Sequence, residues 1–320
     1  MLFEKQMQNI YRSTFANRCD DRGDTFYFSP EDFEGLQSRP FSFRSTAGNM
    51  LKGYFYHYNE PIAGRLIVFD HGFGGGHRAY MREIELLCRQ GYLVYSYDHT
   101  GCMESEGDSP NGLAQSLCDL NDCLTALKQL EGCEELDISV MGHSWGGFST
   151  LNICALHPDV SHIVVFSGFI SVEQMLVQNF NGILKGFRKC IYQLEAEKNP
   201  MSVKYNAVES LSVTDAEVLL VYSDNDKMVS RKFQFDVLYQ ALAGKKNVRF
   251  LLLNNKQHNP NYTENAVKLL GDFTAKLAKF RKKKNATAEE KAAFRNSFDW
   301  RAMTEQDMDV WEQVFKTLEK

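Results

Sequence analysis

The sequence has no run of about 18 apolar residues, the length that a membrane-spanning helix needs. Its first residues include Glu4 and Lys5, where a secretory signal peptide would carry an apolar segment. Basic residues are not in excess either: the net charge is -5, so charge gives no reason to expect nucleic acid as a partner. These absences predict a protein that neither inserts stably into a membrane nor binds nucleic acid.

The eight cysteines form neither a Cys-x-x-Cys pair nor a spacing typical of metal ligands. Several fall inside predicted helices or strands, where a reduced cysteine behaves as a small apolar side chain. We therefore expect no metal site and no disulfide framework, and we expect free thiols in a reducing, cytoplasmic environment.

Segments with strand patterns alternate with helical patterns over most of the chain. After a hairpin at 41–44 and 50–58, strands are predicted at 65–70, 92–97, 136–141, 162–166, 217–222 and 248–253. The helices between and after them are predicted at 80–90, 111–130, 148–156, 231–243 and 261–280. This alternation predicts an α/β fold with a mostly parallel central sheet flanked by helices, in a domain spanning residues 41–283.

Two segments depart from this alternation. Residues 1–40 are rich in aromatic side chains, with a short helix predicted at 3–15, and we expect them to pack on the domain as an arm. Residues 169–213 contain helical patterns without a strand, so we interpret them as a lid inserted over the carboxyl edge of the sheet. An ordinary pair of surface helices is the alternative.

The C-terminal residues 284–320 are predicted to form a helical extension. Thr287 and Glu290 have the spacing of a capping box at the start of its first helix. The second helix has an apolar stripe made of Met308, Trp311, Phe315 and Leu318. We expect this stripe to pack against the domain, and a contact between subunits of a homo-oligomer is the second interpretation.

The most informative stretch is Gly-His-Ser-Trp-Gly at 142–146, between a predicted strand and a predicted helix. Gly-x-Ser-x-Gly on such a turn is typical of a nucleophile elbow. The tight turn requires Gly142 and Gly146 to lack side chains, and it presents the Ser144 hydroxyl to solvent. A glycine-rich turn with an incidental serine is the alternative, so a base, an acid and oxyanion donors must also be identified.

A serine nucleophile needs a base and an acid that orients the base. In hydrolases built on this elbow the chain order is Ser, then Asp or Glu, then His. His258 is the only histidine after residue 162, and it follows the last predicted strand directly. Of the two carboxylates after the preceding strand, we prefer Asp226 as the acid, because it lies three residues before a buried apolar residue; Asp224 is expected to stabilise the turn.

The oxyanion of the intermediate needs two backbone N–H donors. Trp145, the residue after the serine, is expected to supply one. Phe73, in the glycine-rich loop that follows the strand at 65–70, is expected to supply the other. His71 and His77 are predicted to brace this loop. The loop lacks the Gly-Lys-Ser/Thr ending of a P-loop and the spacing of a dinucleotide fingerprint, so we do not interpret it as a phosphate-binding loop.

In these motifs the chain resembles the α/β-hydrolase superfamily, and within it the monoacylglycerol lipase/lysophospholipase and serine aminopeptidase group. The resemblance is carried by residues 71–74, 91–98 and 142–147 together with Asp226 and His258, and it covers about residues 41–280. It implies an α/β-hydrolase fold with a helical lid. The family pattern after the strand at 92–97 usually has two glycines, as Arg-Gly-x-Gly-x-Ser, and here Met103 replaces the second.

The resemblance implies a serine hydrolase that cleaves carboxylic esters of small to medium acyl substrates through an acyl-enzyme. The catalytic groups would be Ser144, Asp226 and His258, with no cofactor and no metal. The apolar lid residues Met175, Leu176 and Phe180 are expected to line the substrate pocket.

Two alternatives differ in chemistry. A serine exopeptidase would need a lid carboxylate to hold the free ammonium of its substrate, and Glu173, Glu195 and Glu197 are available. A non-catalytic binding protein could use the same fold. The presence of serine, aspartate and histidine in the expected order argues against a pure binding protein.

Overall fold

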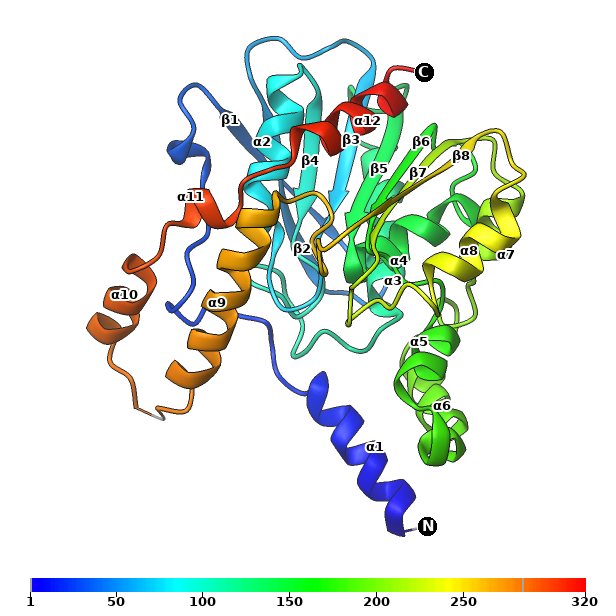
Figure 1. The fold of residues 1–320 in the computed structure, drawn as a ribbon. Helices are drawn as coiled ribbons and strands as arrows, with labels where there is room; N and C mark the ends of the chain where they lie inside the picture. The colour runs from blue at the N-terminus through cyan, green and yellow to red at the C-terminus, as the bar shows by residue number, and fades with distance from the viewer. Residues whose placement is uncertain (1, 284) are drawn as a thin grey trace.

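The computed structural model describes residues 2–283 and 285–320. Met1, in the predicted arm, and Lys284, the first residue of the predicted extension, lie outside the described residues. The sheet has eight strands in the order β1-β2-β4-β3-β5-β6-β7-β8 (Figure 1). The strands are β1 (Gln37–Arg44), β2 (Met50–His57), β3 (Arg65–Asp70), β4 (Leu93–Tyr97), β5 (Asp137–His143), β6 (His162–Phe166), β7 (Glu217–Ser223) and β8 (Val248–Leu253).

Strands β1 and β2 form the predicted hairpin, and β2 also pairs antiparallel with β4. All the other neighbouring pairs are parallel. The predicted α/β class with a mostly parallel central sheet is therefore confirmed. Because strands β3 to β8 run in one direction, their carboxyl ends meet at one edge of the sheet, where sites form in open α/β sheets.

The helices agree with the prediction in order but not at every end. They are α1 (Leu2–Thr14), α2 (Met81–Arg89), α3 (Gln115–Leu127), α4 (Ser144–Asn152), α5 (Val172–Asn179), α6 (Arg188–Lys198), α7 (Ala207–Ser212), α8 (Phe235–Leu242), α9 (Glu264–Phe280), α10 (Ala288–Asn296), α11 (Trp300–Met303) and α12 (Met308–Leu318). Helix α3 begins later than predicted, because Asn111 and Gly112 have φ values of 58° and 108°, which a right-handed helix cannot contain. None of these described helices is long and apolar enough to cross a membrane.

Alternate residues of the parallel strands fill two cores, one on each face of the sheet. On one face Val68, Val140 and Val165 pack with residues of α3, α4 and α8. On the other face Phe69 and Phe166 pack with residues of α2 and α12. The strands therefore read as nearly continuous apolar runs, as expected when helices cover both faces.

The C-terminal segment contributes to the second of these cores. Helix α12 packs against β6 and β7, and Figure 1 shows it lying across the sheet on the same side as α2. The Trp311 side chain is fully buried, with its ring 5.9 Å from that of Phe166. The predicted capping box at the start of α10 is confirmed, because Thr287 and Glu290 each bond the backbone N–H of the other.

Residues 169–213 contain α5, α6 and α7, without a strand. Figure 1 shows α5 and α6 beyond the carboxyl edge of the sheet, with α1 beyond the same edge. The Leu176 side chain is buried in the core on the α4 face, and Met175 and Phe180 are half-buried against that core. These three side chains thus attach the insertion to the domain.

Candidate active site

Ser144 lies at the junction of β5 and α4, with a φ of 55°. A positive φ is rare for a residue with a side chain and costs about 1–3 kcal/mol, so surrounding contacts must hold it. A Cβ added to Gly146 would collide with the carbonyl oxygen of Asp70, and one added to Gly142 with that of Gly146. The elbow geometry thus requires both glycines, as the sequence predicts.

Asp226 and His258 lie together at the ends of β7 and β8. His258 Nδ1 and Asp226 Oδ2 are 2.7 Å apart, and the carboxylate is fully buried. Asp226 Oδ1 accepts hydrogen bonds from the backbone N–H groups of Met228 and Val229, at 2.8 and 3.0 Å. The carboxylate is therefore held in one orientation and keeps the proton of His258 on Nδ1.

His258 Nε2 has no hydrogen-bond partner among the described residues, although it is buried. With Nδ1 protonated, Nε2 is an acceptor. It is therefore available to take a proton.

Asp224, the other carboxylate considered from the sequence, does not contact His258. Its Oδ1 accepts from the backbone N–H of Asn255 at 2.9 Å. Three consecutive residues at the end of β7 accept hydrogen bonds from the loop after β8 in this way; the bonds are Ser223–Lys256, Asp224–Asn255 and Asn225–Gln257. We call residues 254–262 the base loop. These bonds position it against the end of β7.

Phe73 and Trp145, the expected oxyanion donors, are neighbours: their rings are 5.5 Å apart. Trp145 lies in the first turn of α4, where backbone N–H groups have no partner within the helix. Within the described part of the chain, no backbone acceptor is found for the Phe73 N–H. Both groups can therefore donate to a bound oxygen.

His71 and His77 are buried and bonded, as expected for bracing residues. His71 Nδ1–H donates to the carbonyl of Gly72 at 2.8 Å, and its Nε2 accepts from the backbone N–H of His99 at 2.9 Å. Burial, with the nearby charge of His99, lowers the pKa of His71 to about 3, so its ring is neutral. His77 Nδ1 lies 2.7 Å from Asp98 Oδ1.

Sequence reasoning missed a chain of hydrogen bonds that joins the three segments carrying the candidate catalytic groups. The Gly72 N–H, beside Phe73, donates to the Tyr80 hydroxyl at 3.1 Å, which donates to His143 Nδ1 at 2.8 Å. His143 Nε2–H then donates to the carbonyl of His258 at 2.8 Å. Burial, with the nearby His258, lowers the pKa of His143 to about 3, so the ring stays neutral and keeps this donor pattern.

A buried ionic cluster beneath Trp145 was also missed. The His99 ring lies between Asp70 and Asp119, with N···O distances of 3.0 and 3.2 Å, and all three side chains are fully buried. Burial disfavours the charged ring, but the two carboxylates outweigh it and raise the pKa of His99 to about 10. The imidazolium lies 4.7 Å from the Trp145 ring and supports the start of α4.

Met103, which replaces a glycine of the family pattern, has a φ of 42°. The turn thus keeps the left-handed conformation that favours glycine, with a methionine in it. Its carbonyl accepts from Arg18 at 2.8 Å, so the N-terminal segment stabilises the turn.

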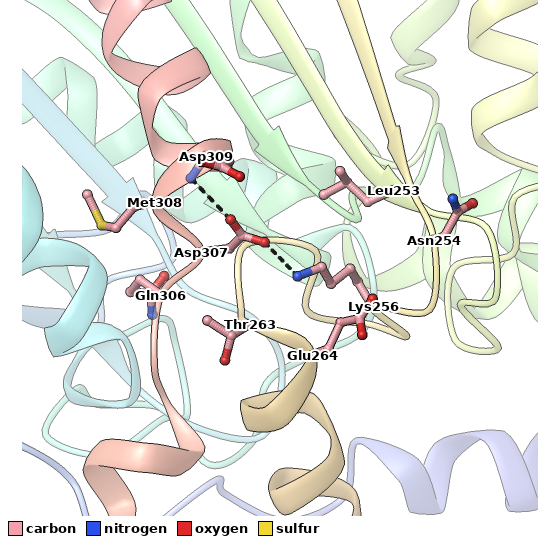
Figure 2. Close-up of a pocket in the computed structure, with 9 residues that line it drawn as sticks. All are labelled: Leu253, Asn254, Lys256, Thr263, Glu264, Gln306, Asp307, Met308 and Asp309. Atoms are coloured by element: carbon pink, nitrogen blue, oxygen red, sulfur yellow. Dashed lines mark hydrogen bonds and ion pairs between the residues drawn. The ribbon is translucent and has the colours of Figure 1, made fainter.

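The base loop also contacts the C-terminal segment (Figure 2). Lys256 Nζ is buried and donates to the carbonyl of Tyr262 at 2.7 Å and to Asp307 Oδ2 at 2.6 Å. An open cavity of about 590 Å³ beside this ion pair is lined by Leu253, Asn254, Lys256, Thr263, Glu264, Gln306, Asp307, Met308 and Asp309. Neither Ser144 nor His258 lines it, so it lies apart from the candidate catalytic groups.

Of the three carboxylates considered in the insertion at 169–213, Glu195 is buried and already bonded. It accepts from the Tyr11 hydroxyl at 2.7 Å and from the Ala114 N–H at 3.2 Å. Glu173 and Glu197 are exposed. Among residues 2–283 and 285–320, no group of three or more His, Cys, Asp or Glu residues is arranged to hold a metal ion.

Comparison with known proteins gives a family and a fold. Residues 62–256 match the family model described as serine aminopeptidase, S33. The esterase Pf2001 of Pyrococcus furiosus is 17% identical, with a TM-score of 0.58, and the match covers 81% of this chain and 96% of that one. The α/β hydrolase GrgF from Penicillium sp. sh18 is 16% identical, with a TM-score of 0.53, over 77% and 97% of the two chains.

The acylaminoacyl peptidase of Pyrococcus horikoshii is 18% identical, with a TM-score of 0.53, over 77% of this chain and 42% of that one. At these identities the likeness establishes the fold. No curated protein sequence is significantly similar to this chain.

Proposed function

Because the chain belongs to the serine aminopeptidase S33 family and is an α/β hydrolase, we propose that it hydrolyses carboxylic esters of small to medium acyl groups with Ser144 as nucleophile. The observation that carries this proposal is the set of catalytic groups at one edge of the sheet. Ser144 lies in a tight turn with a positive φ, and His258 is already hydrogen-bonded to Asp226. The other ring nitrogen, His258 Nε2, has no hydrogen-bond partner among the described residues.

In the proposed mechanism His258 Nε2 takes the Ser144 proton as the hydroxyl oxygen attacks the carbonyl carbon. Asp226 keeps the imidazole in the Nδ1–H form and stabilises its charge. The N–H groups of Phe73 and Trp145 bind the tetrahedral oxyanion. Proton return from His258 releases the alcohol, and a water molecule then repeats the sequence on the acyl-enzyme.

The test is a panel of p-nitrophenyl esters of increasing acyl length, with aminoacyl-anilides measured alongside. Ester turnover should depend on Ser144, so Ser144→Ala should remove it together with fluorophosphonate labelling, while the thermal midpoint stays nearly unchanged. Labelling of another serine in that variant would contradict the assignment.

The anilide arm tests a serine exopeptidase, which the description of the family favours. Glu195 already accepts hydrogen bonds from Tyr11 and Ala114, and this supports the ester proposal over binding of a substrate ammonium. Anilide turnover exceeding that of every ester would replace the ester proposal by the exopeptidase.

A further inference from the structure

Cys19 and Cys102 are adjacent although they are far apart in the sequence. The Cys19 N–H donates to the Gly101 carbonyl at 2.9 Å, and the Cys19 carbonyl accepts from the Met103 N–H at 3.2 Å. These bonds make Cys19 and Cys102 partners in a parallel β-bridge. Neighbouring parallel segments lie about 4.8 Å apart, within the ~4.4–6.8 Å between Cα atoms that a disulfide spans.

The two thiols differ in exposure and in acidity. Cys19 is half-buried, whereas Cys102 is fully buried. A hydrogen bond from Cys102 lowers the pKa of Cys19; burial opposes this, and the Gly74 N–H adds to it. The pKa of Cys102 is raised, by Cys19 and by burial. Thiolate character and access are what make a cysteine reactive, so Cys19 is the reactive member of the pair.

The segment that carries Cys19 contacts the candidate oxyanion loop. The Phe15 ring packs edge-on against Phe73 with centroids 5.3 Å apart, and the Gly74 N–H contributes to lowering the pKa of Cys19. Arg18 also donates to the carbonyls of Met103 and Gly107, which fixes Cys19 beside Cys102. A displacement of the segment that carries Cys19 therefore reaches Phe73, the candidate oxyanion donor.

We propose that Cys19 is a modification site for hydroperoxides, that Cys102 resolves the oxidised form as a disulfide, and that this disulfide slows turnover at Ser144. The last clause rests on the proposed function; the first two do not. None of the three parts needs a further protein.

The chemistry balances with a hydroperoxide as the oxidant. The Cys19 thiolate attacks one peroxide oxygen, the O–O bond breaks, and the leaving oxygen takes a proton to give water or an alcohol. The product is a sulfenic acid at Cys19. The Cys102 sulfur then attacks the Cys19 sulfur, its proton leaves with the hydroxide as water, and the disulfide forms. An added dithiol reverses the step by thiol–disulfide exchange.

The expected effect on turnover follows from the packing of Phe15 on Phe73. Formation of the disulfide draws Cys19 toward Cys102 and shifts the segment that carries Phe15, so the loop that carries the Phe73 N–H is displaced. Loss of one oxyanion donor costs about 10²–10³ in rate. A displaced loop still provides part of the stabilisation that the Phe73 N–H gives the oxyanion, so we expect turnover to fall only about tenfold.

The experiment uses the full-length chain treated with hydrogen peroxide and then digested without reduction for mass spectrometry. We expect a peptide pair linked through Cys19 and Cys102, p-nitrophenyl acetate turnover lowered about tenfold, and recovery on adding dithiothreitol. Cys19→Ser and Cys102→Ser should each keep the untreated turnover within a factor of about two and resist inactivation by peroxide.

Cys118 provides the matched control. It is half-buried like Cys19, but burial, partly offset by a hydrogen bond from Ser202, raises its pKa to about 11. Cys118→Ser should therefore lose turnover under peroxide as the wild type does. If the Cys102 variant fails to fold, two results still test the proposal: the linked peptide in the wild type, and the resistance of the Cys19→Ser variant to peroxide.

Three results would overturn the proposal. If peroxide treatment gave no peptide pair linked through Cys19 and Cys102, the assignment of Cys19 as a modification site would be wrong. Inactivation that persists in Cys19→Ser would assign it to another group. A fully formed disulfide with unchanged turnover would remove the effect on Ser144. Absence of ester turnover before any treatment contradicts instead the proposed function, and the linked peptide would still be read independently.

Discussion

The turn at Ser144 and the base loop hold their candidate catalytic residues in different ways. The elbow depends on residues within a few positions of Ser144, because Gly142 and Gly146 allow the turn. The base loop depends on distant residues: Ser223, Asp224 and Asn225 bind it from β7, and Asp307 binds Lys256 from the start of α12. The position of the candidate nucleophile is thus encoded by a short motif, whereas the position of the candidate base depends on contacts across the fold.

The two sites are nevertheless joined at one residue. His143 precedes Ser144 and donates to the carbonyl of His258, and Tyr80 connects it by hydrogen bonds to the loop of Phe73. The five experiments below test how far the elbow and the base loop act separately.

The largest effect is expected from the base. His258→Ala should lower ester turnover by about 10⁶-fold, as loss of a catalytic histidine does in serine proteases, because the group proposed to take the Ser144 proton is then missing. Steady-state kinetics on an activated ester measure it. His143→Gln is the control: it removes a positioning residue, so turnover should fall only about tenfold with little change in KM. A larger loss from His143→Gln than from His258→Ala would reverse the two roles.

The second largest effect is expected from the acid. Asp226→Asn should lower turnover by about 10⁴-fold, because an amide favours the wrong tautomer of His258. Asp224→Asn keeps an acceptor for the Asn255 N–H, so turnover should change by less than about tenfold. If the two variants ranked in the opposite order, Asp224 would be the acid.

The Lys256–Asp307 ion pair, which joins the base loop to the C-terminal segment, allows the base loop to be tested separately. Lys256→Met leaves the Asp307 carboxylate without its partner, and the free energy of unfolding should fall by about 1–3 kcal/mol, less than for a pair buried on both sides, because Asp307 is 23% exposed. Urea unfolding measures the change, and ester turnover should fall with it as the loop loosens.

Lys316→Ala is the matched control for that variant. It removes an ion pair with Glu312 in the same C-terminal segment, but both side chains are more than half exposed. Its effect on stability should be below about 0.5 kcal/mol. Equal effects of the two substitutions would show that the Lys256–Asp307 pair does not position the base loop.

Alkaline pH should lower the stability of the protein through His99, which lies beside the turn that carries Ser144. The stability that protonated His99 contributes is fully present below its unfolded pKa, about 6.5, and is lost as pH rises through its folded pKa of about 10. The free energy of unfolding should therefore decrease from pH 7 to pH 10. Asp119→Asn removes one of the two carboxylates and should move this loss to lower pH. An identical pH dependence in both proteins would assign the loss to another group.

The smallest effect is expected from the helical insertion. Met175→Ala should alter the relative turnover of long and short p-nitrophenyl esters by a few-fold and leave the acetate nearly unchanged, because a wall of the pocket acts on the acyl chain. Phe180→Ala should act in the same direction. A profile unchanged in both variants would leave these side chains with a packing role alone.

Much of the fold could be predicted because it is written in local patterns. Buried parallel strands read as short apolar runs, and Gly-x-Ser-x-Gly occurs where a strand meets a helix, so the strand order along the chain and the elbow both followed from the sequence. The start of α3 was misplaced, because the left-handed conformations of Asn111 and Gly112 follow from tertiary contacts and not from helical periodicity.

The sequence by itself determined the α/β class, the elbow glycines and the candidates Ser144, Asp226 and His258, because the motif and the chain order identify them. Only the tertiary structure decided that Asp226 and not Asp224 contacts His258, that His143 joins the three segments carrying the candidate catalytic groups, and that Cys19 lies beside Cys102. Each of these is a contact between side chains or segments far apart in the chain. Periodicity and motifs describe neighbours in sequence, whereas a hydrogen bond of 2.7 Å depends on how the packed core places two strand ends.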